Sequence, residues 1–544
     1  MRLSRALLGA LLALALAPAA ASAQAEDTIY ENLSIPTVDG DRIHVEVARP
    51  KGVAKAPVIL TYSPYNSLSE GTSPNLAYDE LGLRYLPKGY ARAVADVLGT
   101  RNSSGCWDYG GRKEQQSGVD LVNALAEQPW ANGKVAMIGG SYDGTTANMV
   151  AARGADAPGL AAIVPELAIS RWYGYAYADG VRYLGNSERP TDEGFDTPFA
   201  FDFGIARTPP TQRTPQTVDA MRDRMNPCDS AEHTLKGYDT SPDYDGFWDE
   251  RDYRKDAGAF RASTLVVHGW QDYNVRQSEG VDLYEALPLP TAASAAAPFK
   301  RLYLFQGGHQ SPNGRPHFDA LLDEFFDTTL RGAAPGPELA APVRTQGRTA
   351  AAPDADLRAE QAWPPAGGAT QRLALGRGLG GGTLGGAAGG PAASFTDLGT
   401  TTEETALRSP SSELTWLAYQ SGPLAADTRV AGTPRLELSL VSDADHGHLT
   451  PVLADIAPDG TAKTITRGFL NLRYRKGLRD DAAVPPGVPV AATVTFSPQD
   501  HTVAKGHRIG LILAGSNTVW AVPDTPAGTT VTVRSGTLVL PTAP

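Results

Sequence analysis

Short apolar runs alternate with segments of helical spacing between about residues 43 and 165. The runs Pro57–Tyr62 and Ala91–Asp96 are typical of buried strands, and a third run covers residues 134–138. Between them, residues 115–128 repeat apolar positions at the spacing of an amphipathic helix. This alternation predicts an α/β fold with a doubly wound parallel sheet.

The alternation stops between about residues 168 and 256, where the chain is rich in Trp, Tyr, Asp and Pro. It resumes with two strand-like runs, Thr264–His268 and Arg301–Phe305. An insertion between sheet strands is a common place to build a cap over an active site. We therefore predict a helical cap over residues 168–256.

The character of the chain changes again past about residue 335. Residues 376–390 are nearly all Gly, Ala and Leu, which predicts a flexible loop. From about residue 395, short strands such as Pro434–Leu440 and Arg508–Leu513 are separated by Gly, Pro and Asp turns. This pattern predicts an all-β jelly-roll sandwich at the C-terminus.

The N-terminal segment has the features of a secretion signal. Arg2 and Arg5 precede the apolar stretch Ala6–Ala17, and Ala21-Ser22-Ala23 is typical of a cleavage site. We expect cleavage after Ala23 and an extracellular protein.

Three parts of the chain are thus expected. They are a signal peptide (residues 1–23), an α/β-hydrolase domain (24–345) and a C-terminal β-sandwich (346–544). A length of 544 residues is too great for one ordinary core, which agrees with two folded domains.

Composition and charge limit the kinds of partner that this protein is expected to bind. The net charge of -12 disfavours nucleic acid and anionic membranes, and no later run of about 18 apolar residues predicts a membrane span. The two cysteines, Cys106 and Cys228, are expected to form a disulfide in an exported protein, with two buried thiols as the alternative. Without clustered histidines they predict no metal site, and no cofactor is expected. The oligomeric state stays open.

The hexapeptide Gly139–Gly144 carries the main chemical signal. It reads Gly-Gly-Ser-Tyr-Asp-Gly and lies between an apolar strand and a helix of small residues. A serine at such a strand–turn–helix junction presents its hydroxyl at the edge of the sheet, and the glycines allow close packing around the strained turn. Ser141 is therefore a candidate nucleophile.

A serine nucleophile needs a histidine base and a carboxylate that orients it, in this fold in the order Ser, acid, His. Asp272 follows the strand at 264–268, and His309 follows the strand at 301–305. Either residue alone would usually be an ordinary loop residue, but together with the elbow they predict a catalytic triad. Of the other histidines, His268 is better interpreted as structural, and His317 is the near rival.

The reaction also needs donors for the developing oxyanion. One is expected from the backbone N–H of Tyr142, directly after the nucleophile. A second must come from a loop after an early strand, where the phenol of Tyr65 is a candidate and a packed turn tyrosine is the alternative.

These motifs resemble the Xaa-Pro dipeptidyl-peptidase family of serine peptidases and its cocaine-esterase-like relatives. The similarity extends over most of the mature chain and is carried by seven segments: Ala131–Met137, Gly140–Tyr142, Ser170–Tyr175, Phe247–Trp248, Val267–Val275, Asp455–Gly460 and Leu472–Arg475. The resemblance implies a hydrolase domain with an inserted cap and a C-terminal jelly roll.

The resemblance also implies roles for individual residues. Ser141 would be the nucleophile, Asp272 the acid and His309 the base, with Tyr65 and the Tyr142 N–H as the oxyanion donors. The implied reaction releases an N-terminal dipeptide whose second residue is proline, through an acyl-enzyme.

Such a substrate needs an apolar slot for proline and a carboxylate for the free ammonium group. Trp172 and Tyr175, with Tyr173 between them, are candidate walls of the slot, although an aromatic cluster in a cap is often core. The candidate carboxylates are those of the cap segment: Glu188, Asp192 and Glu193.

The sequence therefore predicts a secreted serine exopeptidase that acts on a peptide substrate. The first alternative keeps the triad and acts as an esterase or acylase on amino-acid esters or amides. A non-catalytic binding protein is disfavoured because all three triad residues are present.

Overall fold

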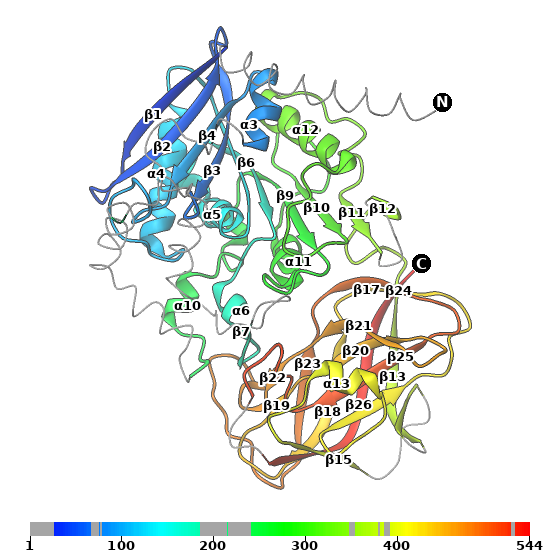
Figure 1. The fold of residues 1–544 in the computed structure, drawn as a ribbon. Helices are drawn as coiled ribbons and strands as arrows, with labels where there is room; N and C mark the ends of the chain where they lie inside the picture. The colour runs from blue at the N-terminus through cyan, green and yellow to red at the C-terminus, as the bar shows by residue number, and fades with distance from the viewer. Residues whose placement is uncertain are drawn as a thin grey trace.

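The computed structural model describes residues 27–66, 76, 79–184, 215, 241–347, 354–378, 381–385, 392–523 and 528–544. Within these residues the chain forms an α/β domain followed by an all-β domain, which lies below the first in Figure 1. The part of the chain that the structure describes contains no helix long and apolar enough to cross a membrane.

The N-terminal domain is built on one mixed sheet with the order β1-β2-β4-β3-β5-β6-β9-β10-β11-β12. Its strands from β4 to β11 run parallel, and the antiparallel strands β1, β2 and β12 complete the two edges. The strands are β1 (Thr28–Pro36), β2 (Arg42–Pro50), β3 (Ala56–Ser63), β4 (Ala91–Asp96), β5 (Ala131–Gly140), β6 (Leu160–Glu166), β9 (Ser263–Gly269), β10 (Lys300–Phe305), β11 (Val343–Gln346) and β12 (Leu357–Glu360).

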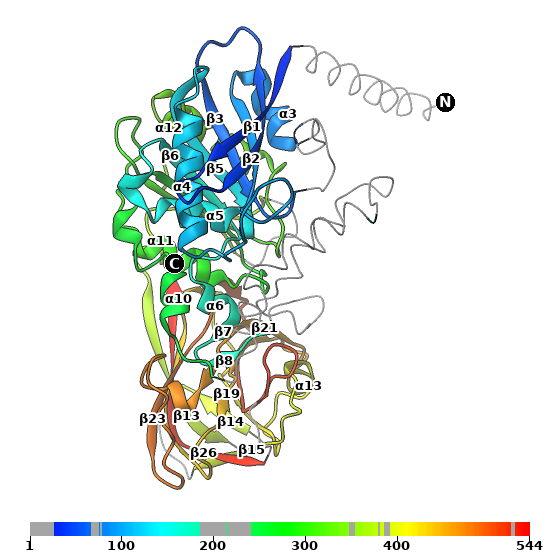
Figure 2. The same cartoon turned by 90° about the vertical axis from the view of Figure 1, so that its left-hand side faces the viewer.

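Helices cover both faces of this sheet, as Figure 2 shows from the side. One apolar cluster joins the sheet to α4 (Arg112–Ala126), α5 (Tyr142–Ala151) and α11 (Gln277–Ala286). A second cluster joins the other face to α3 (Glu80–Tyr85) and α12 (Pro316–Arg331). The doubly wound sheet predicted from the alternating pattern is confirmed.

The sheet extends further along the chain than predicted. The strand β12 pairs antiparallel with β11, so the first sheet continues to Glu360, past the predicted domain boundary at 345/346. The sequence analysis missed β12 because the surrounding chain is rich in Ala and Pro. An edge strand also needs little apolar patterning, so it leaves a weak signal.

Only the two ends of the predicted cap lie within the described residues. They form α6 (Trp172–Ala176), the short pair β7 (Tyr177–Ala178) and β8 (Val181–Arg182), and α10 (Gly246–Glu250). All of these elements lie on the side of the first domain that faces the β domain (Figure 1).

The C-terminal domain is a β-sandwich around its own apolar cluster. The 15-residue strand β26 connects much of it, because it pairs with β13, β15, β17 and β18. The elements are β13 (Ala369–Gly378), β14 (Gly381–Leu384), β15 (Ala393–Asp397), α13 (Glu403–Arg408), β16 (Trp416–Gln420), β17 (Thr428–Gly432), β18 (Arg435–Ser442), β19 (His448–Leu449), β20 (Val452–Ile456), β21 (Ala462–Arg467), β22 (Leu470–Asn471), β23 (Val490–Thr495), β24 (Gln499–Val503), β25 (Arg508–Ala514) and β26 (Thr529–Ala543).

The glycine-rich segment corrects one prediction. Residues 376–390 were expected to be a loop, but Leu375–Gly378 pairs antiparallel with Gly381–Leu384. A Cβ at Gly382 would lie 2.0 Å from the Tyr419 ring, so glycine here lets the strand pass close to an aromatic side chain. Composition alone predicted flexibility and missed this packing requirement.

Candidate active site

Ser141 stands on a strained turn between β5 and α5. Its backbone has φ 59° and ψ -126°, a conformation that non-glycine residues rarely adopt. The Ser141 N–H donates to the Glu166 carbonyl at 2.9 Å, which ties the turn to the neighbouring strand β6. A Cβ at Gly144 would lie 2.5 Å from the Gly139 carbonyl oxygen, so both glycines are required for this crossing.

Asp272 and His309 meet at the carboxyl ends of β9 and β10. The His309 Nδ1 lies 2.8 Å from Asp272 Oδ2. The other carboxylate oxygen, Oδ1, accepts the backbone N–H groups of Asn274 and Val275 at 3.1 and 3.0 Å. The carboxylate is fully buried, whereas the His309 side chain keeps 25% of its surface exposed. The acid is thus fixed by its own loop, and Nε2 of the imidazole is left for the reaction.

Burial and charge act in opposite directions on the His309 ring. Burial by itself lowers the pKa of His309, but the adjacent Asp272 carboxylate and its hydrogen bond raise it more, so the pKa lies above its ordinary value. Above this pKa the imidazole is neutral and can accept a proton from serine.

The two other histidines considered from the sequence make different contacts. His268 is also close to Asp272, but its Nε2 lies 3.6 Å from Asp272 Oδ2, beyond hydrogen-bonding distance. His268 is fully buried, its Nε2 donates to the Val275 carbonyl at 2.9 Å, and burial lowers its pKa. His317 lies 3.4 Å from Glu338 and packs against Tyr303. Neither occupies the position that His309 holds beside Asp272.

The side chain of Tyr65 lies next to Ser141. Its phenol lies within hydrogen-bonding range of both the Ser141 side chain and the Tyr142 backbone N–H. Burial raises the pKa of Tyr65, with a contribution from Asp143, so the phenol keeps its proton and can donate. The loop is held by the Ser63 hydroxyl, which accepts the Tyr65 N–H at 3.0 Å.

The side chain of Tyr142 is anchored by a buried polar network that the sequence analysis did not find. Its hydroxyl donates to the Glu114 carboxylate at 2.9 Å and accepts the Trp107 indole N–H at 2.8 Å. The Gly110 N–H also donates to Glu114, at 2.8 Å. Burial raises the pKa of Glu114 to about 8. A glutamate in the first turn of a helix carries no sequence signal for this role.

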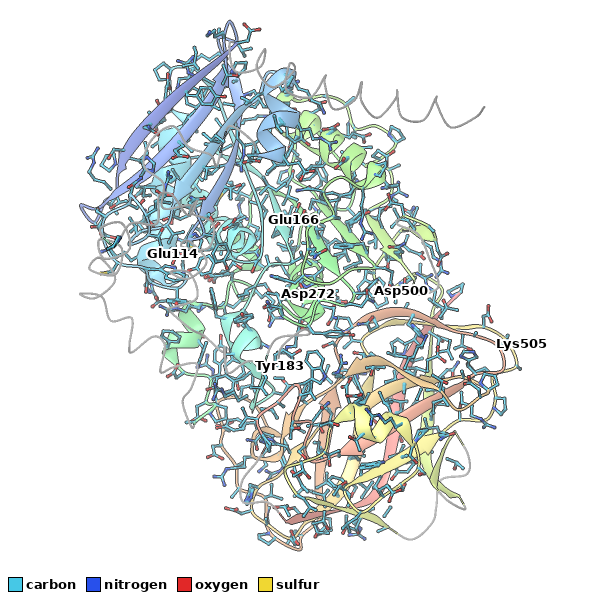
Figure 3. All side chains as sticks on the ribbon, viewed as in Figure 1. Glu114, Glu166, Tyr183, Asp272, Asp500 and Lys505 are labelled. Atoms are coloured by element: carbon cyan, nitrogen blue, oxygen red, sulfur yellow. The ribbon has the colours of Figure 1, made fainter. Side chains whose placement is uncertain are left out.

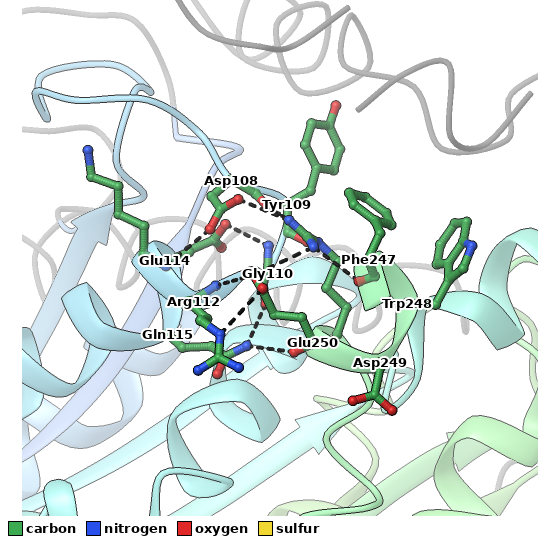
Figure 4. Close-up of polar contacts among 12 residues, drawn as sticks. Asp108, Tyr109, Gly110, Arg112, Glu114, Gln115, Phe247, Trp248, Asp249 and Glu250 are labelled. Atoms are coloured by element: carbon green, nitrogen blue, oxygen red, sulfur yellow. Dashed lines mark hydrogen bonds and ion pairs between the residues drawn. The ribbon is translucent and has the colours of Figure 1, made fainter. Parts of the chain in front are cut away.

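The cap holds the loop that precedes Glu114 (Figure 4). The buried Arg251 guanidinium donates to the Asp108 carboxylate at 2.9 Å and to the Tyr109 carbonyl at 3.0 Å. On the other side of the loop, the Gln115 amide donates to the Glu250 carbonyl at 2.9 Å. These contacts link α10 of the cap to the residues behind Tyr142.

A second buried carboxyl group, that of Glu166, was also missed. It lies at the end of β6, within hydrogen-bonding range of Ser311, two residues after His309. Burial raises the pKa of Glu166 to about 7, and nearby Glu80 adds to this effect. Glu166, which Figure 3 labels, is thus near the His309 loop through its side chain and accepts the Ser141 N–H through its carbonyl.

The predicted substrate residues are only partly described. Trp172 is buried, and its ring lies 5.3 Å from Tyr142 and 5.9 Å from the half-buried Tyr175. Tyr173 instead belongs to the cap core, where its hydroxyl donates to the Pro242 carbonyl at 2.6 Å.

Several predicted residues lie outside the described part of the chain. These are the three cap carboxylates Glu188, Asp192 and Glu193, and Cys228, so the ammonium site and the Cys106–Cys228 disulfide stay predictions. Among the residues that the structure does describe, no group of three or more His, Cys, Asp and Glu side chains could hold a metal ion.

The parallel sheet, the strained serine turn and the Asp272–His309 pair define the protein as an α/β-hydrolase of the serine type. Residues 39–311 match the family model of the X-Pro dipeptidyl-peptidases (S15 family). Residues 335–541 match the model of the X-Pro dipeptidyl-peptidase C-terminal non-catalytic domain. The chain therefore belongs to the X-Pro dipeptidyl-peptidase family of serine hydrolases, as its motifs indicated.

Curated relatives agree with this membership. A Streptomyces avermitilis protein, assigned by name to the Xaa-Pro dipeptidyl-peptidases, is 29% identical over 94% of this chain and 84% of its own length. The Xaa-Pro dipeptidyl-peptidase of Lacticaseibacillus paracasei is 25% identical over 85% of this chain and 63% of its own length.

Solved structures share the two-domain fold. A CocE/NonD family hydrolase from Staphylococcus aureus superposes with a TM-score of 0.74 at 15% identity, covering 95% of this chain and 94% of that one. An α-amino acid ester hydrolase superposes with a TM-score of 0.70 at 18% identity, covering 95% and 97%. At these identities the likeness establishes the fold alone.

Replacing Tyr65 with Phe tests the second oxyanion donor. Loss of one such donor typically lowers kcat by about 10²–10³-fold, and we expect this loss with little change in KM. The matched control is Tyr62→Phe, which removes a buried hydroxyl bonded to Ser117 at 3.0 Å. Steady-state kinetics of both variants provide the measurement, and equal losses in the two would contradict a special role for Tyr65.

Replacing Glu114 with Gln tests the buried carboxyl group behind Tyr142. Because the folded-state pKa of about 8 lies above the ordinary 4.5, ionisation of Glu114 should make the wild type less stable as pH rises from 4.5 to 8. Gln cannot ionise, so the variant should gain melting temperature relative to wild type between pH 5 and pH 8. Thermal denaturation at both pH values measures this, and a constant difference would show that Glu114 does not titrate in this window.

Proposed function

We propose that this protein is a secreted exopeptidase that releases N-terminal Xaa-Pro dipeptides through an acyl-enzyme. The observation that carries the proposal is the 2.8 Å contact between His309 and Asp272. The two residues follow β10 and β9 of the same sheet whose strand β5 leads into the Ser141 turn, which Tyr65 also approaches. Membership of the family supports a peptidase, and the Xaa-Pro dipeptidyl-peptidase names of its relatives support the proline preference.

Each group has a step in the proposed mechanism. Ser141 Oγ attacks the carbonyl carbon of the prolyl residue while His309 Nε2 takes the serine proton. Asp272 holds the ring through Nδ1 and stabilises the imidazolium ion. The Tyr142 N–H and the Tyr65 hydroxyl donate to the oxyanion.

The intermediate collapses when His309 gives its proton to the leaving amine, which releases the shortened peptide and leaves the dipeptide as an ester on Ser141. A water molecule then attacks this ester with His309 again as the base, and the free dipeptide departs.

Substrate selection is proposed to come from the cap. Tyr175 is the half-buried aromatic side chain next to Trp172, and a prolyl ring would pack against such a surface. Glu188 or Glu193 would accept the free ammonium group. Secretion is proposed from the N-terminal signal pattern, and export of the full chain from its host tests it.

A pair of substrates distinguishes this function from the esterase or acylase alternative. We expect a glycyl-prolyl anilide to be cleaved at least tenfold faster than the same anilide with its amine acetylated, because the exopeptidase requires a free ammonium group. Ser141→Ala should abolish both activities. Rapid turnover of simple acyl esters with no anilide cleavage would support the alternative instead.

The pH profile reports the state of His309. The base must be neutral, so kcat/KM should rise with pH through the His309 pKa, and the half-maximal point should lie above the ordinary value of 6.5. The Asp272→Asn variant lacks the carboxylate that raises the His309 pKa. Its residual activity, lower by about 10⁴-fold, should therefore increase with pH at a lower pH than in the wild type. Kinetics from pH 5 to 9 measure both profiles, and coincident acid limbs would refute the assignment.

A further inference from the structure

Trp270 lies two residues before the proposed acid Asp272, and Tyr273 follows it directly. Both residues contact the C-terminal β-sandwich. We propose that this domain, through Gln499 and Arg467, positions Asp272 for the reaction. The inference rests on the proposed triad, and it gives a role in catalysis to a domain whose family model is described as non-catalytic.

The first contact acts on the backbone two residues before the acid. The fully buried Gln499 donates its side-chain amide to the Trp270 carbonyl at 3.0 Å. The same carbonyl accepts the amide of Gln277, in α11, at 2.6 Å. Trp270 itself is fully buried. Its carbonyl is therefore fixed by one donor from each domain.

Gln499 is itself rigidly placed. The next residue in β24, Asp500, is fully buried and accepts two hydrogen bonds from Arg429, at 2.9 and 2.8 Å. Asp500 also accepts the hydroxyl of Thr345 in β11 of the first sheet at 2.9 Å. A buried, bidentate pair of this kind allows little movement, so β24 keeps a fixed position on the hydrolase domain.

The second contact acts directly after the acid. The Tyr273 ring lies 5.2 Å from the Trp520 ring, and the Arg467 guanidinium lies 4.3 Å from the centre of each. Arg467 is held in turn by an ion pair with Glu403. The Tyr273 carbonyl accepts the hydroxyl of Tyr183, at the end of the cap hairpin, at 2.9 Å.

Asp272 thus lies on a short loop whose two sides are attached to another domain. Figure 3 shows Asp272, Tyr183 and Asp500 along this boundary. The acid works only if its Oδ2 stays at hydrogen-bonding distance from His309 Nδ1, now 2.8 Å. Misplacement of a catalytic group by about 1 Å can cost 10²-fold in rate, so contacts that fix the loop have catalytic consequences.

The test uses Gln499→Met and Arg467→Met, which remove the two contacts and approximately keep side-chain length. We expect each to lower kcat about tenfold or more with KM changed less than twofold. The acid limb of kcat/KM should move to lower pH, because a displaced Asp272 stabilises the imidazolium ion less. In an Asp272→Asn background neither substitution should lower the residual rate further, since both act through the acid.

Two other interdomain contacts supply matched controls. Tyr474 donates to Asp243 at 2.9 Å, and Arg479 lies 2.7 Å from Asp249, at the same boundary but away from the acid loop. Tyr474→Phe and Arg479→Ala should therefore leave the pH profile unmoved. If they shift it as Gln499→Met does, or if Gln499→Met lowers the rate equally in the Asp272→Asn background, the sandwich acts only through stability and the proposal is overturned.

A second measurement, the labelling of Ser141, does not depend on which substrate the enzyme accepts. The rate at which a fluorophosphonate labels Ser141 depends on the triad and not on proline recognition, so it should fall in parallel with kcat. Slower labelling together with no cleavage of prolyl anilides would reject the proposed substrate and still support the positioning role. If one variant fails to fold, the other is sufficient for the test, because Gln499 and Arg467 contact different sides of the loop.

Discussion

The hydrogen bond between Asp272 and His309 is central to the chemistry that we propose for this protein. It joins a fully buried carboxylate to an imidazole that remains partly exposed, and it raises the pKa of a ring that burial alone would lower. Both residues are supplied by neighbouring parallel strands, β9 and β10, which end at the same edge of the sheet. The doubly wound sheet matters because it brings these ends together with the Ser141 turn.

The surroundings of this pair form successive layers of support. The turn of Ser141 is tied to β6, and Tyr142 is tied to Glu114 through its side chain. The cap forms hydrogen bonds with the loop before Glu114, and the β-sandwich contacts the loop of Asp272 on both sides. Different parts of the molecule therefore hold different groups of the proposed site, and such support can maintain a strained turn like that of Ser141.

Much of the fold could be predicted because its patterns are local. Buried parallel strands such as Pro57–Tyr62 are continuous apolar runs, and the strand β4 has the bounds that its sequence predicted. The wrong predictions arise where the local sequence carries no signal. At Gly382 the requirement is the approach of a distant ring, Tyr419, and at β12 the strand is an edge that needs no apolar face. Glu114 and Glu166 look like ordinary acidic residues until burial raises their pKa values.

The order of strands, turns and residue types along the chain was enough to predict Ser141, Asp272 and His309 as a candidate triad and to indicate the family. Such a motif is readable because turn geometry and strand order are imposed by neighbouring residues. The folded structure was needed to show that Asp272 and His309 are in contact, that Tyr65 lies next to Ser141, and that the C-terminal domain contacts the Asp272 loop. These facts join residues far apart in the chain, and long-range packing, unlike a local pattern, leaves no spacing in a single sequence.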